Sequence, residues 1–476
     1  MSIPTLIRSR VGVAIAKSPG IDVYEQSFLV EALVREALIA GGLGSKDPKA
    51  PLRDIVEPGM SVLLKPNWVL HVNLSGNTMD CMVTHQSFII AVVREVARAK
   101  PRRIIIADAP IQRTDFTALV SESWKAKVRE AAAGADLDIL DLRNLIAFHC
   151  GRRLDTKGNI RDPSRFVLFD LGGDSLLEPI STPVGRFRNT SYNPDDMGKV
   201  QRPGEHKYLL CKEPFEADLV INLPKLKAHG KAGMTAALKN LVGINGDKNF
   251  LPHHRVGGTA WGGDCYAGFK PLKRLSEYCA DQANRRIGRN SYVLWKQASD
   301  MLNAMHGGDL EGKWYGNDTV WRMALDLNRL LLYGRPDGTL SNRPLRTIYS
   351  ITDGIVAGEA NGPLAPEPVS LGAVTFASDS AYADLVHAAL MRFDWRKIPL
   401  VREAFRKMSR PLVQGHPEDL VVSYGNRNLT LSETAQELGL TFRPPRGWVG
   451  RIEWKELASS EAAKTDDAKT SRIPIL

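Results

Sequence analysis

The sequence lacks the short motifs that identify several large classes of enzyme. It has no GxGxxG motif after the first expected strand, no GxxxxGK motif followed by Ser or Thr, and no GxSxG motif. These motifs bind nicotinamide dinucleotides, bind nucleotide phosphates, or carry the nucleophile of serine hydrolases. The sequence therefore gives no support to any of these three functions.

Cysteine is also scarce. No two of the five cysteines in the 476 residues form a CxxC pair. Paired cysteines are the usual ligands of structural zinc and of iron–sulfur clusters. We therefore expect buried free thiols, no disulfide framework and no iron–sulfur motif. The five residues are Cys81, Cys150, Cys211, Cys265 and Cys279.

Long apolar runs are absent as well. No stretch of 18 apolar residues occurs, and the N-terminal residues lack a run long enough for an export signal. We therefore expect a soluble, cytoplasmic protein without a membrane partner. Residues Ser459 to Arg472 have almost no large apolar side chain, which predicts a solvated tail.

The charge is positive but dispersed. Lys and Arg number 63 against 53 Asp and Glu, which gives a net charge of +10, yet no long Lys/Arg tract or nucleic-acid-binding motif accompanies it. A small anionic ligand or a generally basic surface explains this excess as well as nucleic acid does. Nucleic-acid binding therefore ranks last among the functions considered.

Short apolar runs alternate with helical patterns along the chain. The pattern predicts buried strands at Ser61 to Leu64, Arg103 to Ala107 and Asp218 to Asn222. It also predicts a helix through Phe88 to Ala99 with Thr84 as its N-cap. Continuous apolar strands between helices are typical of parallel sheets. We predict an α/β protein with a largely parallel, Rossmann-like sheet flanked by helices.

Composition divides the chain into six segments. Two of them interrupt the α/β pattern, one polar and one mostly helical. The segments are a first α/β segment (1–145), a polar insertion with hairpins (146–213), a central strand and ligand-loop segment (214–270), a helical insertion (271–340), a C-terminal α/β segment (341–455) and a disordered tail (456–476).

Polar residues follow the predicted strands. Lys65 and Asn67 come after one, Asp108 ends the next, and Lys225 and Lys227 leave the strand that ends at Asn222. Ligand crevices of open α/β sheets lie at the carboxyl ends of the strands. We therefore expect these side chains to meet in one cleft.

The central segment concentrates cationic side chains. Met234 to Leu241 has helical propensity with Thr235 as a possible cap, so free N–H groups at its start would face an anion held by the lysines. Lys239 lies on the same face as Thr235. Lys231 is expected on a solvated edge.

The following loop carries imidazole, amide, guanidinium and carboxylate groups on glycine-rich backbone. His253 and His254 are adjacent, so in an extended segment only one faces the site. We predict that His229 or His254 moves protons. The remaining candidates in and before this loop are the ligand-binding residues Asn240, Asn245, Lys248 and Arg255 and, with Asp108, the divalent-cation ligands Asp247 and Asp264.

These motifs together resemble a known bacterial and archaeal family. They are Lys65-Pro-Asn67, Thr84-His85, Asp108, VINLPKLKAHGKAGMTAALKNLVGINGDK, Asp353-Gly354, Gly358, Gly362-Pro363, Ala377-Ser-Asp379 and Asp384. The family they resemble is domain of unknown function 362. The resemblance implies an α/β protein of undetermined biochemistry.

This chain departs from the family pattern in two places. Many relatives look fused to ferredoxin-like cysteine motifs for iron–sulfur clusters, and this chain has none. Where the family usually reads Asp-Pro-Val-Ala, this chain has Asp379-Ser-Ala-Tyr382, which keeps the carboxylate and loses the proline. An inherited redox role is therefore in doubt.

The leading functional hypothesis is an enzyme acting on a small phosphate- or carboxylate-bearing substrate, with a divalent metal as a possible cofactor. The first alternative is a non-catalytic accessory protein that binds an anion or a metal. The second is a redox protein related to the iron–sulfur-containing relatives.

Overall fold

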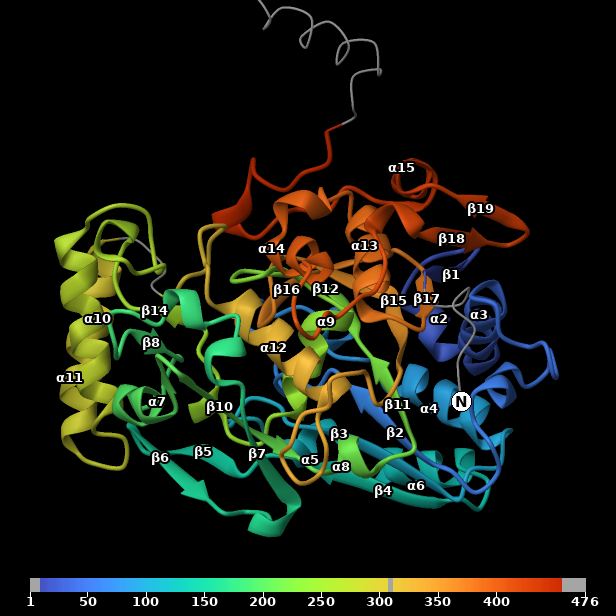
Figure 1. The fold of residues 1–476 in the computed structure, drawn as a ribbon, viewed down its shortest axis with the longest axis horizontal. Helices are drawn as coiled ribbons and strands as arrows, with labels where there is room; N and C mark the ends of the chain where they lie inside the picture. The colour runs from blue at the N-terminus through green and yellow to red at the C-terminus, as the bar shows by residue number, and fades with distance from the viewer. Residues whose placement is uncertain (1–8, 307–310, 456–476) are drawn as a thin grey trace, which may run out of the picture.

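The computed structural model describes residues 9–306 and 311–455, and its centre is a 12-stranded sheet. The strands of this sheet are β1 (Arg10–Ile15), β2 (Ser61–Pro66), β3 (Arg103–Asp108), β4 (Asp136–Asp141), β11 (Leu219–Leu223), β12 (Lys225–His229), β13 (Gly233–Thr235), β15 (Ile348–Asn361), β16 (Ala365–Val369), β17 (Ala373–Ala377), β18 (Val421–Tyr424) and β19 (Arg427–Leu429). Its main path runs β19-β18-β1-β17-β15-β11-β2-β3-β4 (Figure 1).

The half of the sheet from β15 to β4 is parallel throughout. β11 pairs in parallel with β15 and β2, and β3 pairs in parallel with β2 and β4. In contrast, β17 runs antiparallel to both of its neighbours, β1 and β15. This arrangement confirms the predicted α/β fold with a largely parallel sheet, and it brings the carboxyl ends of β11, β2 and β3 to one edge.

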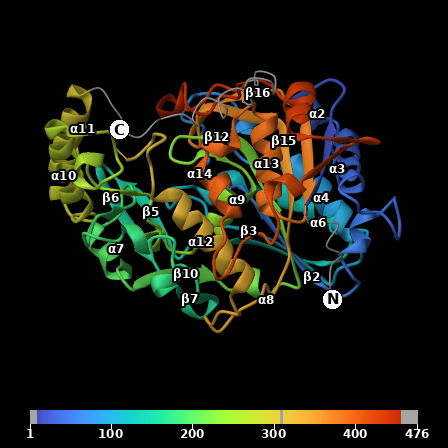
Figure 2. The same cartoon turned by 45° about the horizontal axis from the view of Figure 1, so that its top comes forward.

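Helices cover both faces of the sheet (Figure 2). Side chains alternate along β2, so Val62 and Leu64 join one apolar core while Leu63 joins the other. Buried residues of α3 (Ser27–Ala40), α4 (Gln86–Ala97) and α6 (Glu122–Ala131) belong to the first core. Those of α9 (Ala237–Asn240), α12 (Val320–Tyr333) and α13 (Ser380–Leu390) belong to the second.

Two groups of elements interrupt the sheet. One contains the β5–β6 hairpin and the small sheet of β7, β10 and β9, and the other contains the paired helices α10 and α11 at the margin of the molecule (Figure 1). Their bounds are β5 (Leu145–Cys150), β6 (Arg153–Gly158), β7 (Phe166–Asp170), β8 (Phe187–Arg188), α7 (Pro194–Val200), β9 (Gln201–Arg202), β10 (Glu205–Cys211), β14 (His254–Arg255), α10 (Pro271–Asn284) and α11 (Ser291–Met305). The other short helices are α2 (Asp22–Glu25), α5 (Phe116–Leu119), α8 (Glu213–Glu216), α14 (Pro399–Arg402) and α15 (Leu431–Glu433).

The N-cap of α4 differs from the sequence prediction. His85, not Thr84, occupies this position, and its Nδ1 accepts a hydrogen bond from the backbone N–H of Ser87 at 3.1 Å. The Thr84 hydroxyl instead donates to the carbonyl of Leu223 at 2.7 Å. Thr84 therefore joins two strand ends of the sheet instead of starting the helix.

Among residues 9–306 and 311–455, no helix is both long enough and apolar enough to cross a membrane. The predicted solvated tail lies outside the described residues.

Candidate functional site

The carboxyl edge of the parallel strands holds a buried ion pair. Lys65 on β2 lies opposite Asn222 of β11 in the sheet register. Its ammonium group donates to Asp108 Oδ1, at the end of β3, at 2.7 Å, and both side chains are buried. The parallel sheet therefore brings Lys65 and Asp108 together from 43 residues apart in the sequence.

Three asparagine amides extend this pair into a network. Asn240 donates to Asn222 Oδ1 at 2.7 Å and to the carbonyl of Lys65 at 3.1 Å. Asn67 donates to Asn240 Oδ1 at 2.9 Å and accepts from the Lys227 ammonium at 2.7 Å. One hydrogen-bonded network thus contains five of the sequence-predicted residues: Lys65, Asn67, Asp108, Lys227 and Asn240.

Position 243 requires glycine because the backbone there passes very close to the Lys65–Asp108 ion pair. A Cβ atom at this position would lie 2.0 Å from Asp108 Oδ1 and 2.6 Å from Lys65 Nζ. Those distances are far inside van der Waals contact, so only glycine fits there.

Lys225 has different partners from Lys227. Its ammonium lies 2.9 Å from Asp353 Oδ2 and 2.8 Å from the hydroxyl of Tyr24, which itself donates to Asp353 Oδ1 at 2.5 Å. The His85 ring stacks on Tyr24 with centroids 3.8 Å apart. Lys225 is therefore neutralised by the protein itself, and the sequence carried no signal for Tyr24 as its partner.

Lys227, Lys239 and Lys248 have no carboxylate partner among the residues that the structure describes. Lys227 donates to Asn67 and to the carbonyl of Met82, and Lys248 donates to the carbonyl of Ala109 at 2.9 Å. Burial is the main cause that lowers the pKa of Lys227 to about 7, of Lys239 to about 7 and of Lys248 to about 8. Neighbouring ammonium groups lower each pKa further, whereas the Asp108 carboxylate raises the pKa of Lys227 and of Lys248. This edge of the sheet therefore holds three lysines that no ion pair among the described residues neutralises.

Lys231 adds to this charge. The sequence pattern predicted a solvated edge at this residue, but its side chain is buried, with the ammonium 3.5 Å from the Thr190 hydroxyl. Burial lowers its pKa, the Glu311 carboxylate opposes this shift, and the Lys313 ammonium adds to it. That expectation was wrong because the β12–β13 hairpin folds back into the protein instead of lying at its surface.

The start of α9 also differs from the prediction of a helix over Met234 to Leu241. Gly233–Thr235 forms β13, paired with β12, and α9 begins only at Ala237. The carboxylate of Asp384 accepts the backbone N–H groups of Ala237 at 2.8 Å and Leu238 at 3.0 Å. Those two N–H groups are therefore occupied by the protein.

Replacing Asp384 with alanine should destabilise the fold, because two N–H groups and the ring nitrogen of His387, 2.9 Å from Asp384, lose their acceptor. We expect a loss of about 1–3 kcal/mol for each group left unpaired. Urea unfolding measures it, with Asp136→Ala on the exposed edge strand β4 as the control. A variant as stable as the control would contradict this role of Asp384.

Asn245 is buried, and its side chain makes no hydrogen bond to any residue that the structure describes. Within the same residues, the buried hydroxyl of Thr235 also lacks a partner. Buried polar groups are normally hydrogen-bonded, so the Asn245 amide is available to bind a ligand or a water molecule. Asn245 precedes the uncompensated Lys248 by three residues and is one of the residues predicted to orient a ligand.

The three histidines of the central segment are all neutral at pH 7. Burial lowers the pKa of His229, His253 and His254 well below its usual value, and the surrounding lysines lower it further. His229 and His253 both interact electrostatically with Lys239. The ring of His254 is buried, with Nδ1 unpaired in the described part of the chain.

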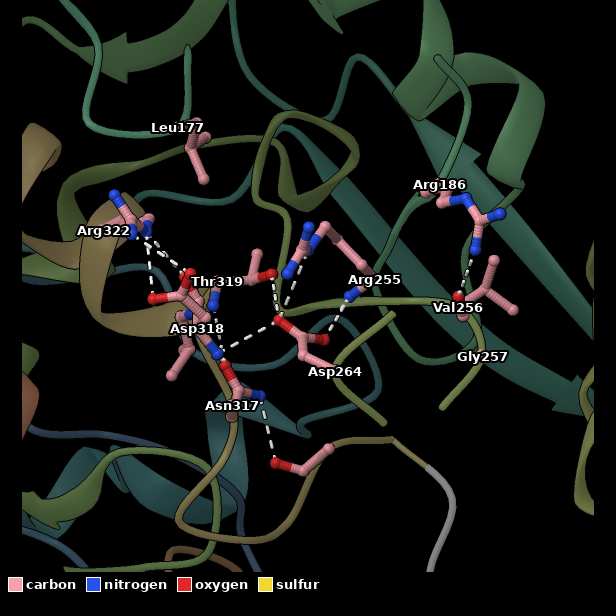
Figure 3. A network of polar contacts seen from close by, with 12 residues as sticks. Leu177, Arg186, Arg255, Val256, Gly257, Asp264, Asn317, Asp318, Thr319 and Arg322 are labelled. Atoms are coloured by element: carbon pink, nitrogen blue, oxygen red, sulfur yellow. Dashed lines mark hydrogen bonds and ion pairs between the residues drawn. The ribbon is translucent and has the colours of Figure 1, made fainter. Parts of the chain in front are cut away.

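Asp264 makes hydrogen bonds that hold loops together (Figure 3). It accepts from the backbone N–H of Arg255 and from the Thr319 hydroxyl, each at 2.5 Å, and from the N–H of Asp318 at 3.1 Å. Its ion pair with the Arg255 guanidinium is longer, at 3.8 Å. Arg255 and Asp264 therefore pair with each other instead of with the Lys65 network.

The three aspartates predicted as metal ligands occupy separate environments. Asp108 pairs with Lys65, Asp264 with Thr319 and Arg255, and Asp247 caps a short helix through the N–H of Asn249 at 2.9 Å. Over the described ranges, no group of three or more His, Cys, Asp or Glu side chains is placed to hold a metal ion. The structure does not bring these three carboxylates together.

A groove of about 610 Å³ lies elsewhere, between α3 and the β18–β19 hairpin. Arg10, Arg35, Glu36 and Ser423 are among its lining residues, and none of the sequence-predicted site residues lines it. The candidate site is therefore defined by its charges and unpaired groups, not by this groove.

The fold and this edge of the sheet define an α/β protein with a cationic candidate site. The model of the family described as domain of unknown function (DUF362) matches residues 153–389, so this part of the chain belongs to that family. The match confirms the resemblance seen in the sequence. A thylakoid-associated protein of Synechocystis sp. is 24% identical over 253 residues, which cover 52% of this chain and 55% of that protein. The chain thus spans about half the length of the curated relative it matches.

Two solved structures show distant likeness. One is a crystal structure of a protein from Thermotoga maritima, with a TM-score of 0.33 and 10% identity over 71% of this chain and 53% of that one. The other is the lactate racemase apoprotein from Thermoanaerobacterium thermosaccharolyticum, with a TM-score of 0.29 and 13% identity over 75% of this chain and 54% of that one. Both scores are low, so neither likeness carries a functional argument.

Proposed function

We propose that this protein is an enzyme that binds a small phosphate- or carboxylate-bearing substrate among Lys227, Lys239 and Lys248. The observation that carries the proposal is the uncompensated charge of these lysines. Burying an unpaired cation is costly, and an anion that occupies the site offsets that cost. The lowered pKa values of the three lysines are consistent with a site whose counter-ion is a ligand.

The surrounding network suits this role. Lys65, Asn67 and Asn240 are fixed by hydrogen bonds to one another, which holds Lys227 in place without neutralising it. The unpaired amide of Asn245 supplies both a donor and an acceptor for ligand oxygens. Rigid donors that are already in place are what electrostatic stabilisation of an anionic substrate requires.

The divalent metal of the sequence hypothesis has weaker support than the anion. Its three aspartates make separate hydrogen bonds, and two of them already pair with cationic side chains. The described residues support an anion site built from lysines and amides. The redox alternative stays a prediction, with four of the five cysteines buried and scattered through the chain.

Thermal unfolding with a panel of phosphate, sulfate, acetate and oxalate tests the proposal. An anion that binds only the folded state should add about 2.7 kcal/mol to the free energy of unfolding when its concentration is a hundred times its dissociation constant. The same panel with Lys239→Met should give at most about half of this stabilisation, because binding at least tenfold weaker leaves about 1.4 kcal/mol or less. Lys157→Met, at an exposed position on β6, should behave like the unmodified protein. Absence of stabilisation by every anion in the panel would refute the proposal.

The pH dependence follows from the lowered pKa values. Lys227 and Lys239 have a pKa of about 7 in the folded protein against 10.5 in an ordinary environment, so above pH 7 the unfolded state binds more protons. The free energy of unfolding should therefore rise between pH 7 and pH 9, by up to about 1.4 kcal/mol per pH unit for each lysine. The buried thiol of Cys211, whose pKa burial raises, opposes this trend only above about pH 9.

Urea unfolding at pH 7, 8 and 9 measures this effect. Lys227→Met should flatten the dependence, because methionine does not titrate. Anion affinity should fall over the same range as the lysines lose their charge. An equal slope in the unmodified protein and in Lys227→Met would show that Lys227 titrates normally.

A further inference from the structure

We infer that His229 and His253 have opposite tautomers and different chemical roles at this site. His229 is the hydrogen-bond donor to an oxygen of the bound anion, and His253 is the base that takes a proton from it. The inference rests on the proposed function and specifies the substrate class. His253 replaces His254, which the sequence analysis had favoured.

The tautomer of His229 follows from its backbone contacts. Its Nδ1 lies 3.0 Å from the backbone nitrogen of Lys231 and 3.1 Å from that of Ala232, and both are N–H donors. A backbone N–H only donates, so Nδ1 must be the unprotonated acceptor. In the neutral ring the proton is therefore on Nε2, which makes His229 a donor through Nε2–H.

The opposite holds for His253. Its Nδ1 lies 2.8 Å from the carbonyl oxygen of Leu251, and a carbonyl only accepts. Nδ1 must therefore carry the proton, and Nε2 keeps its lone pair. Both rings are neutral at pH 7, because burial and the nearby lysines lower their pKa.

The two rings share the same charged surroundings. The charged groups that act on His229 are Lys239, Lys231 and Lys227, together with the His253 ring. Those that act on His253 are Lys239, Lys231 and Lys248. The carbonyl of Arg188 accepts from the His253 backbone N–H at 2.8 Å, and Thr190, two residues further on, contacts Lys231.

This arrangement suits removal of a proton from the carbon beside a carbonyl group. His253 Nε2 takes the proton, and the electron pair of the broken C–H bond forms the carbon–carbon double bond of an enolate. The negative charge moves to the carbonyl oxygen, where His229 Nε2–H and the lysines stabilise it, and His229 keeps its proton. A neutral imidazole donor in this role is known from other enzymes.

Return of a proton from His253 to the same carbon restores the carbonyl compound, so this step exchanges that hydrogen with solvent and needs no oxidant or reductant. The substrate class is therefore a carbonyl compound with a hydrogen on the neighbouring carbon and a phosphate or carboxylate group for the lysines. Binding of the anion also neutralises the lysines around His253. Its pKa then rises toward the ordinary range, which makes it a stronger base when substrate is present.

Nitrogen-15 NMR of the full chain at pH 7 tests the assignment, because the two ring nitrogens of each tautomer have distinct chemical shifts. His229→Gln and His253→Gln assign the signals, and His149→Gln, at an exposed position on β5, is the control. We expect a proton on Nε2 of His229 and on Nδ1 of His253. The same tautomer in both rings, or a doubly protonated ring, would overturn the inference.

Addition of inorganic phosphate separates this inference from the proposed function. We expect the pKa of His253 to rise by about one unit and the signals of both histidines to shift. If phosphate stabilises the protein but leaves both histidine signals unchanged, the division of roles is wrong while the anion site stands. If neither phosphate nor any other anion binds, the proposed function fails whatever the tautomers are.

Discussion

Lys225→Met should lower the free energy of unfolding by about 3–5 kcal/mol, the cost of breaking a buried ion pair from one side. The substitution leaves the Asp353 carboxylate buried without its cation, with only Tyr24 and backbone N–H groups as partners. Both charged side chains are 0% exposed, so water cannot replace the lysine. Urea unfolding followed by circular dichroism measures the loss.

The double variant Lys225→Met with Asp353→Leu is the matched control. Replacing both partners of a buried pair by apolar groups is often close to neutral, so this variant should recover much of the lost stability. A single variant within 1 kcal/mol of the unmodified protein, on the order of a surface substitution, would mean that the pair is not buried as described.

Lys239→Met should have the opposite effect to Lys225→Met on the free energy of unfolding of the ligand-free protein. Lys239 has no carboxylate partner within the described ranges, and at pH 7 its burial holds its pKa near the solution pH. Lys239 is partly exposed but strongly desolvated, so removing this unpaired cation should raise the free energy of unfolding by about 1–3 kcal/mol. The same change should weaken phosphate binding at least about tenfold, equivalent to about 1.4 kcal/mol.

This combination separates a binding residue from a structural one. Replacing a structural lysine, such as Lys225, should make the protein less stable. Replacing a binding lysine should make the protein more stable and lower its affinity for the anion. Lys157→Met, exposed on β6, should change neither quantity. A destabilised Lys239→Met protein that still binds phosphate normally would reassign Lys239 to the scaffold.

The sheet and its carboxyl edge were predictable from the sequence because their signals are local. Buried strands such as β3 are continuous apolar runs, and the polar residue that ends each run marks the edge. Lys65 and Asp108 followed from this rule once the strands were assumed to be parallel. Their ion pair needs no information beyond the order of strands in the sheet.

The structure of the central segment was not predictable because distant residues determine it. Gly233, with φ of +83°, lets the chain turn so that Met234 pairs with Ala228, and this pairing overrides the helical propensity of the segment. Asp384, 147 residues away, then occupies the start of α9. Neither contact can be recognised from the hydrophobic pattern of the residues around Gly233 or Ala237.

The partners of the lysines could not be predicted from the sequence either. Lys225, Lys227 and Lys239 are the same residue type, yet among the described residues only Lys225 pairs with a carboxylate, because Asp353 of β15 lies opposite it in the sheet. The difference between a neutralised lysine and a charged one depends on this pairing. It decides which lysines are available to a ligand, and the sequence alone does not contain it.

Calorimetric titration at pH 8 with phosphate and with oxalate, in two buffers of different ionisation enthalpy, tests the central claim most directly. The account predicts binding accompanied by proton uptake, because an anion raises the pKa of lysines that are partly neutral at this pH. It also predicts that Lys239→Met reduces both the affinity and the uptake. Absence of binding by both anions, or binding with no proton uptake and no dependence on Lys239, would contradict it.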